Sequence, residues 1–139
     1  MPRSRAQPGF RKVRADHAIE TAEDYLEAIG GIVQERGVCR VKDLADHMGV
    51  SHVTVVKIIA RLQGQGLVDT APYQPITLTP LGGRLAEATR RRHEIVLAFL
   101  LALGVPRAEA ERDAEGIEHH VSAATLSRME AYLRDAGDI

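Results

Sequence analysis

The stretch VKDLADHMGVSHVTVVKIIARLQ, residues 41–63, decides the fold of this chain. Its apolar residues recur at helical spacing and predict a short helix over 41–48 and a second helix over 52–63. Gly49 is a suitable end for the first helix, and the hydroxyl of Ser51 is placed to cap the start of the second. The stretch therefore predicts two helices joined by a tight turn.

The two helices have the packing signature of a helix-turn-helix. This motif needs a small residue at the helix crossing, a turn residue that tolerates positive φ and an aliphatic residue that locks the second helix, and Ala45, Gly49 and Val55 meet these needs. We expect the second helix to enter the DNA major groove. Its residues predicted to contact bases or phosphates are Ser51, His52, Thr54, Lys57 and Arg61.

The remaining elements extend this motif on both sides. An amphipathic helix is predicted over 21–35, and the β-prone segments 67–70 and 76–79 are predicted to form a wing. Beyond the wing, the capping and helix-breaking residues predict helices over 80–103, 106–120 and from 123 onward. The predicted fold is mainly α, with a winged helix-turn-helix domain at 17–79 and an all-helical dimerisation domain at 80–139.

The N-terminal segment differs in composition from the rest. Residues 1–14 carry five basic side chains, no acidic one, two prolines and a glycine. This composition predicts a flexible basic arm over 1–16, with Arg11 and Lys12 as DNA contacts. Because the formal net charge of the chain is −1, DNA binding must come from such local basic patches and not from bulk charge.

Composition also limits the class of protein. No apolar run approaches the roughly 20 residues needed to span a bilayer, so the sequence predicts a cytoplasmic protein without a membrane partner. The single Cys39 excludes an internal disulfide and a thiolate zinc cluster. We expect no small organic ligand.

Several metal-capable side chains lie at helical spacing. Glu115, Glu118 and His119 stand at i, i+3 and i+4, which predicts one shared helix face within reach of a cation. Asp24 and Glu27 form an i, i+3 carboxylate pair on an earlier helix. Each pattern alone is also typical of solvent-facing residues or surface ion pairs, so the residues leave both interpretations open.

Three separated segments carry a family resemblance. DAEGIEHHVS at 113–122, RHE at 92–94 and EDYLE at 23–27 resemble the manganese transport regulators of the diphtheria toxin repressor family. The resemblance covers nearly the whole chain. It implies a binuclear divalent-cation site in each subunit, whose ligand positions here are Asp24, Glu27, His93, Glu115, Glu118 and His119.

The chemistry of these side chains agrees with that implication. Carboxylates and imidazoles without a thiolate suit Mn²⁺ or Fe²⁺ better than Cu⁺ or a structural Zn²⁺. Iron-sensing relatives carry a cysteine where Glu115 stands, which favours Mn²⁺, with Fe²⁺ as the alternative ion.

The predicted function is a manganese-responsive repressor that binds operator DNA as a homodimer, with metal bridging the two domains. An iron-responsive repressor of the same family is one alternative. A metal-independent regulator is another, in which Glu115, Glu118 and Asp24 pair with the arginines at 90–92. A carboxylate-bridged dimetal enzyme is disfavoured, because only one helix carries an adjacent Glu and His and no catalytic partner is evident. We therefore do not expect an enzyme.

Overall fold

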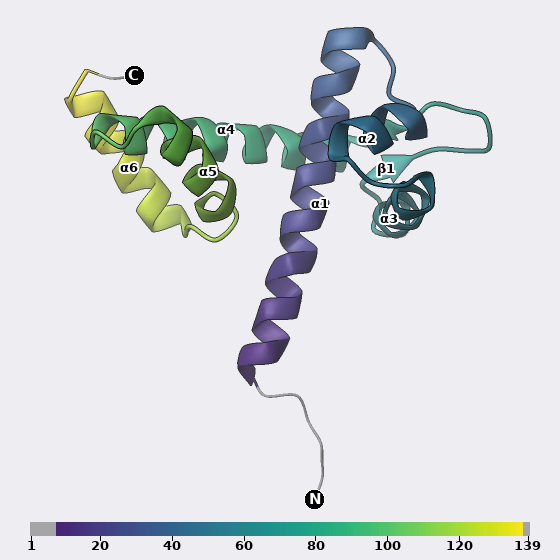
Figure 1. Cartoon of the computed structure of the whole chain (residues 1–139), viewed down its shortest axis with the longest axis horizontal. Helices are drawn as coiled ribbons and strands as arrows, with labels where there is room; N and C mark the ends of the chain where they lie inside the picture. Colours follow the sequence, from purple (N-terminus) through teal and green to yellow (C-terminus); the bar gives the residue numbers. More distant parts are fainter. Residues whose placement is uncertain (1–7, 138–139) are drawn as a thin grey trace, which may run out of the picture.

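The computed structural model describes the backbone of residues 8–137 and the side chains of residues 17–137. A long helix, α1, crosses a second long helix, α4, with the winged elements on one side of the crossing and the last two helices on the other (Figure 1). The elements are α1 (Pro8–Arg36), α2 (Val41–Met48), α3 (His52–Gly64), β1 (Val68–Asp69), β2 (Thr77–Leu78), α4 (Pro80–Ala102), α5 (Arg107–Ile117) and α6 (Ala123–Asp135). Within the described residues, no helix is both long and apolar enough to cross a membrane.

The helix-turn-helix forms where the sequence predicts it. Helix α2 has the predicted bounds, and Gly49 ends it with a φ of 68°, a left-handed conformation that suits glycine. Ser51 caps α3, because its hydroxyl accepts a hydrogen bond from the Thr54 N–H at 3.2 Å. The prediction of a helix-turn-helix is confirmed.

The wing is an antiparallel ribbon of two short strands. Val68 pairs with Leu78 and Asp69 pairs with Thr77, so each strand is shorter than the four-residue segment predicted. One further bridge, between Cys39 and Ile76, joins the wing to the segment before α2. We call residues 17–79, from α1 through the wing, the winged half and residues 80–137 the helical half.

Helix α1 begins earlier than the sequence analysis predicts. It starts at Pro8 and not near residue 21, so the backbone of 8–16 is helical where a flexible arm is predicted. Proline is well suited to the first turn of a helix, and the residues from 10 to 20 contain neither glycine nor proline to stop it. Residues 1–7, and the side chains of Arg11 and Lys12, lie outside the described part, so the predicted DNA contacts of this arm stay predictions.

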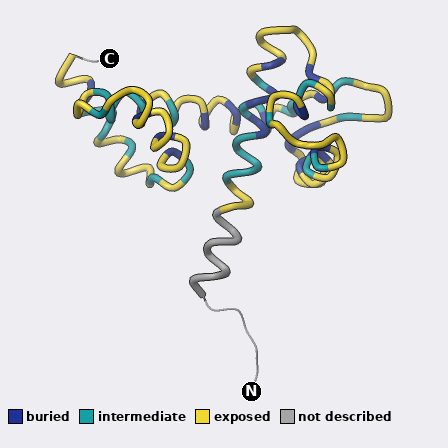
Figure 2. Tube along the Cα trace, viewed as in Figure 1, coloured by how far each residue is buried: buried dark blue, intermediate teal, exposed yellow. Residues whose placement is uncertain are grey.

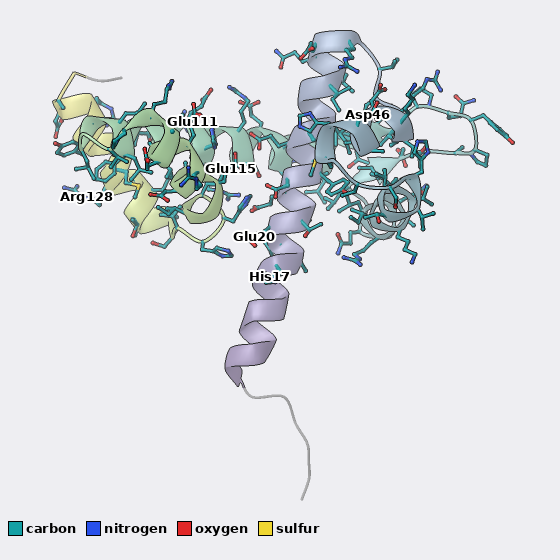
Figure 3. The ribbon with its side chains drawn as sticks, in the orientation of Figure 1. His17, Glu20, Asp46, Glu111, Glu115 and Arg128 are labelled. Atoms are coloured by element: carbon teal, nitrogen blue, oxygen red, sulfur yellow. The ribbon has the colours of Figure 1, made fainter. Side chains whose placement is uncertain are left out.

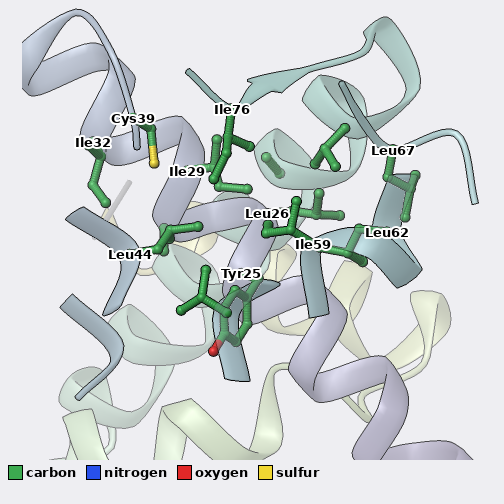
Figure 4. Close-up of a cluster of buried hydrophobic side chains, with 14 of the residues drawn as sticks. Tyr25, Leu26, Ile29, Ile32, Cys39, Leu44, Ile59, Leu62, Leu67 and Ile76 are labelled. Carbon is green, nitrogen blue, oxygen red and sulfur yellow. The ribbon is translucent and has the colours of Figure 1, made fainter. Parts of the chain in front are cut away.

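The hydrophobic core lies in the winged half (Figure 4). Leu26 and Ile29 of α1 pack with Leu44 of α2, Leu62 of α3 and Ile76 beside the wing, and each of these side chains is at most 1% exposed. They come from elements far apart in sequence, so burial of this cluster holds the helix-turn-helix and the wing against α1.

The start of α4 fixes the junction of the two halves. The Thr79 hydroxyl accepts a hydrogen bond from the Gly82 N–H at 3.0 Å and donates one to the Gly66 carbonyl at 2.7 Å. A Cβ atom on Gly82 would lie 1.9 Å from the Leu67 carbonyl oxygen, so only glycine permits this approach of helix to wing. From here α4 runs out to the helical half, where buried positions along the chain are fewer (Figure 2).

Helix α5 is shorter than predicted. It ends at Ile117 and not near His120, and residues 118–120 form a turn closed by a hydrogen bond from the His120 N–H to the Ile117 carbonyl at 3.0 Å. Ser122 then starts α6, its hydroxyl accepting from the Thr125 N–H at 3.1 Å. Glu118 keeps helical φ and ψ at this end, so the early end of α5 changes the direction in which His119 points.

Candidate metal centre

The predicted metal-binding residues meet where α1, α4 and the end of α5 come together. α1 and α5 each present acidic residues near this junction, among them Glu20 and Glu115 (Figure 3). The junction is also the boundary between the halves: Asp24 and Glu27 belong to the winged half, and His93, Glu115 and Glu118 belong to the helical half.

His93, Glu115 and Glu118 form the first group of side chains. Each offers a ligand atom, and these atoms all lie within 4.8 Å of one another. His93 Nδ1 is 3.1 Å from Glu118 Oε1. Burial opposes protonation of His93, but the hydrogen bond to Glu118 and the charges of Glu118, Glu115 and Glu27 raise its pKa above the usual value. Such a set of oxygen and imidazole donors fits a divalent cation.

Glu118 is a buried carboxylate whose charge is only partly compensated by its neighbours. Its side chain is 1% exposed, and within the described residues its Oε2 atom has no hydrogen-bond partner. Burial raises the pKa of Glu118 to about 7, although His93 opposes the shift. A buried carboxylate with a free oxygen is costly unless a positive charge meets it, so the donor set fits a metal ion.

His119 belongs to a second, adjacent group. Its ring nitrogen Nδ1 lies 2.8 Å from Glu23 Oε1 and its Nε2 lies 3.0 Å from Asp24 Oδ1, and its side chain is 2% exposed. The hydrogen bonds to Asp24 and Glu23 raise the pKa of His119 to about 10, against the effect of burial. His119 therefore ties the end of α5 to α1.

Glu27 interacts electrostatically with residues of both groups. Burial raises its pKa, His93 lowers it, and the charges of Glu115 and Asp24 raise it further. Asp24, Glu27 and Glu115 also line a cavity of about 630 Å³ that extends between α1 and the end of α2. Carboxylates from both halves thus face one shared, accessible space.

The arrangement differs from the predicted one at His119. The sequence predicts Glu115, Glu118 and His119 on a single helix face, but His119 turns toward α1 while the two glutamates face His93. Glu118 keeps helical φ and ψ and stays on the face of Glu115, whereas His119 follows in a turn, where helical spacing no longer sets side-chain directions. The full ligand set stays a prediction, with its members placed in two neighbouring groups.

Glu23 and Arg92 also lie at this site, although the sequence did not single them out. Arg92 of α4 forms an ion pair with Glu23, and the Glu23 side chain is 16% exposed. Although burial opposes ionisation of Glu23, its bonds to His119 and Arg92 lower its pKa. A signal was available: residues 20, 23, 24 and 27 share one face of α1 at i, i+3, i+4 and i+7, so Glu23 lies on the same acidic face as the predicted ligands.

The predicted alternative, with arginines 90–92 neutralising the acidic residues, is wrong for the described part of the chain. Arg90 pairs with Glu87 and Glu94, and Arg91 pairs with Glu130. Among the ion pairs of the described residues, Arg92 is the one of these three arginines that pairs with α1, and its partner there is Glu23 and not Asp24. Cys39 also offers no thiolate, because burial raises the pKa of its thiol to about 11.

The predicted DNA-contacting side chains lie on α3 and at its start. Ser51, His52, Lys57 and Arg61 are exposed, whereas Thr54 is half-buried and its hydroxyl lies 3.1 Å from that of Ser51. Their role in DNA binding stays a prediction.

Fold and site together define a winged-helix regulator with a candidate metal centre at its domain junction. Residues 17–76 match the model of the iron dependent repressor N-terminal DNA binding domain, and residues 79–137 match its metal binding and dimerisation domain. The chain belongs to the iron dependent repressor family.

Named relatives confirm the resemblance seen in the sequence. The chain is 45% identical over 129 residues to the transcriptional regulator MntR of Salmonella typhimurium, covering 93% of this chain and 82% of the relative. It is 35% identical over 107 residues to the HTH-type transcriptional regulator MntR of Geobacillus kaustophilus, covering 77% and 76%. Both relatives are named as transcriptional regulators.

Solved structures agree in fold. A manganese-dependent transcriptional repressor in complex with manganese is 38% identical, with a TM-score of 0.72 over 85% of this chain, and the metal-dependent transcriptional regulator MtsR is 29% identical, with a TM-score of 0.75 over 81%. The chain spans about half, 53%, of the length of these two chains. The predicted fold class, a winged helix-turn-helix followed by a helical domain, is confirmed.

Proposed function

We propose that this chain is a manganese-responsive transcriptional repressor, working in the cytoplasm, that binds operator DNA as a homodimer when cations occupy the junction between its halves. The observation that carries the proposal is Glu118, a buried carboxylate with a free oxygen beside His93 and Glu115. The relatives named MntR and the manganese-bound repressor structure support this metal and this class of activity.

The proposed ligands are the side chains at the junction, and two ions per chain fit their division into two neighbouring groups. The first group is His93, Glu115 and Glu118, and the second brings Asp24 and His119 together. Glu27 interacts electrostatically with residues of both groups, so it is placed to be a ligand in either group. When bound, the cations supply positive charge that offsets the mutual repulsion of these carboxylates.

The switch follows from where the ligands are attached. Asp24 and Glu27 are fixed in α1, which the core joins to the recognition helix α3, while His93 and Glu118 are fixed in the helical half. Residues of both halves that hold the same cations cannot move independently. This restriction narrows the spread of distances between the recognition helices of a dimer, which must match half-sites about one DNA turn apart.

The helical half supplies the proposed dimer contact. It matches a dimerisation domain, and it leaves large apolar side chains exposed, including Leu103 and Tyr132. A dimer aligns two α3 helices on operator DNA, with Ser51, His52 and Lys57 toward base edges or phosphates.

A DNA-binding titration tests the proposal. The probe is a duplex selected by the wild-type chain, with Mn²⁺ present, from a random-sequence library, and affinity is measured by fluorescence anisotropy at fixed salt with Mn²⁺, Fe²⁺, Zn²⁺ and Co²⁺. We expect Mn²⁺ to raise affinity in wild type and in Glu111→Ala, whose exposed carboxylate on α5 contacts only Arg107 among the described residues.

The Glu115→Ala variant should lose this Mn²⁺ response. Equal DNA affinity with and without Mn²⁺ in the wild-type chain would support a metal-independent regulator, and a larger response to Fe²⁺ than to Mn²⁺ would support the iron-responsive alternative.

A further inference from the structure

Glu23 holds the ring of His119 from the side opposite to the predicted ligand Asp24. Nδ1 of His119 is 2.8 Å from Glu23 Oε1, and Nε2 is 3.0 Å from Asp24 Oδ1. An ionised carboxylate can only accept a hydrogen bond, so Nδ1 donates to Glu23. This fixes the ring orientation and leaves Nε2 as the nitrogen that faces the metal-binding side chains.

Both oxygens of Glu23 are already engaged. Oε1 accepts from His119, and Oε2 forms an ion pair with the guanidinium of Arg92 on α4. Glu23 therefore differs from its neighbour Asp24, whose carboxylate is 39% exposed and opens onto the cavity at the junction. Because both of its oxygens are engaged, Glu23 is poorly placed to bind a cation itself and well placed to orient His119.

Arg92 anchors this support to the helical half. Its side chain is 25% exposed, it reaches Thr89 Oγ1 at 3.4 Å on its own helix, and its charge lies against Glu23 of α1. Three segments thus meet in one chain of contacts: Arg92 of α4, Glu23 of α1 and His119 after α5.

We infer that Glu23 is a positioning residue for the metal centre, fixed by Arg92, which orients His119 so that Nε2 faces the cation. The inference rests on the proposed function, since it assigns His119 as a ligand. Carboxylates that accept from the second nitrogen of a ligating histidine commonly set both its tautomer and its orientation.

The test compares Glu23 with Glu20, one helical turn away on α1. Glu20 Oε1 lies 3.1 Å from His120 Nε2, so Glu20→Ala removes a similar histidine contact across the same junction without touching His119. Mn²⁺ affinity is measured by competition with a fluorescent chelator. We expect Glu23→Ala to weaken Mn²⁺ binding by roughly 10- to 100-fold and Glu20→Ala by less than about fivefold.

Two further variants keep the test decisive if Glu23→Ala folds poorly. Glu23→Gln retains an oxygen that accepts from Nδ1 but loses the charge, so its loss should be smaller than that of Glu23→Ala. Arg92→Ala should weaken Mn²⁺ binding in the wild-type background and change little in the Glu23→Ala background, because Arg92 acts through Glu23.

A spectroscopic readout separates positioning from general packing. In ¹⁵N NMR spectra with diamagnetic Zn²⁺, His119 should show a protonated Nδ1 and a coordinated Nε2 in the wild-type chain and in Glu20→Ala, but a mixture of ring states in Glu23→Ala.

The outcomes distinguish the two levels of proposal. If His119→Ala binds Mn²⁺ as tightly as wild type, His119 is not a ligand, and the second ligand group and the positioning role of Glu23 both fail, while the first group of His93, Glu115 and Glu118 is tested separately by Glu115→Ala. If His119→Ala loses affinity but Glu23→Ala loses no more than Glu20→Ala, only the positioning role of Glu23 is overturned.

Discussion

The winged half and the helical half bury different kinds of side chain. The winged half has a continuous apolar core, in which Leu26, Leu44 and Leu62 are at most 1% exposed. The helical half buries fewer large apolar residues, chiefly Ile95, Val96 and Leu133. It also buries polar or charged side chains, those of Thr89, Glu118 and His119.

Because of this difference, the two halves are stabilised in different ways. Apolar burial alone can stabilise the winged half, because each large side chain removed from water contributes roughly 1.5 to 3 kcal/mol. The helical half instead places a carboxylate in its interior, which is costly until a cation or proton neutralises it. Metal should therefore act on the helical half and on the junction, and only through them on DNA binding.

The largest effect should come from the apolar core. Replacing Leu62 with Ala should lower the free energy of unfolding by roughly 2 to 5 kcal/mol, because it leaves a cavity in a fully buried cluster. Chemical denaturation with and without Mn²⁺ should show the same loss in both conditions, since Leu62 lies apart from the metal centre. If Leu62→Ala no longer gained stability from Mn²⁺, the apolar core of the winged half and the metal centre would not be independent sources of stability.

The junction should be the next most sensitive position. A methyl group on Gly82 would meet the Leu67 carbonyl, so Gly82→Ala should lower the free energy of unfolding by about 1 to 3 kcal/mol. Gly83 is the matched control: it is the next residue of α4, and beyond its chain neighbours and its own helix backbone an added Cβ would meet no described atom within 4 Å. Gly83→Ala should stabilise the chain slightly in thermal unfolding, and equal losses in both variants would rule out the close contact as the cause.

Much of this could be predicted from local sequence signals. The bounds of α2, the Ser51 and Thr79 caps and the start of α4 follow from short-range chemistry and were predicted correctly. The positions of His93, Glu115 and Glu118 beside one another depend on tertiary packing, and only the family resemblance brought these separated residues together.

What the sequence did not reveal depends on helix ends and on long-range partners. The end of α5 at Ile117 redirects His119; Gly116 lies in the last turn of the helix, but neither glycine nor proline follows among residues 118–120 to mark the end. The Glu23–Arg92 pair joins residues far apart in the chain, and periodicity can place Glu23 on a helix face but cannot name what packs there.

Metal-free stability should fall as pH rises, and Glu118 should account for part of the fall. Its folded-state pKa of about 7 lies above its ordinary value of 4.5, so folding favours the protonated form and stability decreases as pH rises from 4.5 through 7. Glu118→Gln should therefore lose roughly 1 to 3 kcal/mol less than wild type between pH 5 and pH 8 in urea unfolding with chelator present. Parallel pH profiles for the two proteins would contradict this origin.

His119 should extend the decrease to higher pH. Its pKa is raised from 6.5 to about 10, so its stabilising contribution is complete below pH 6.5 and is lost as pH rises through 10. His119→Gln should flatten the metal-free profile between pH 8 and pH 10, and an unchanged slope there would show that the contacts with Asp24 and Glu23 do not stabilise the fold.

The smallest effect should come from a single phosphate contact in the winged half. Lys57→Ala should weaken binding to the selected duplex and lower the slope of log affinity against log salt by about 1, because one fewer counterion is released. Arg128 is an exposed residue of α6 in the helical half, and Arg128→Ala removes the same charge there. Anisotropy titrations at several salt concentrations should give Arg128→Ala the same slope as wild type. Equal slope changes in the two variants would indicate that both halves contact DNA.

The central claim is that cations at the junction couple the helical half to DNA binding by the winged half. Coupling is reciprocal, so operator DNA must tighten Mn²⁺ binding by the same factor that Mn²⁺ tightens DNA binding. Calorimetric titration of Mn²⁺ into the protein, with and without saturating duplex at one salt concentration, measures this directly. We predict roughly 5- to 150-fold tighter Mn²⁺ binding with DNA present, and equal affinities would contradict the account.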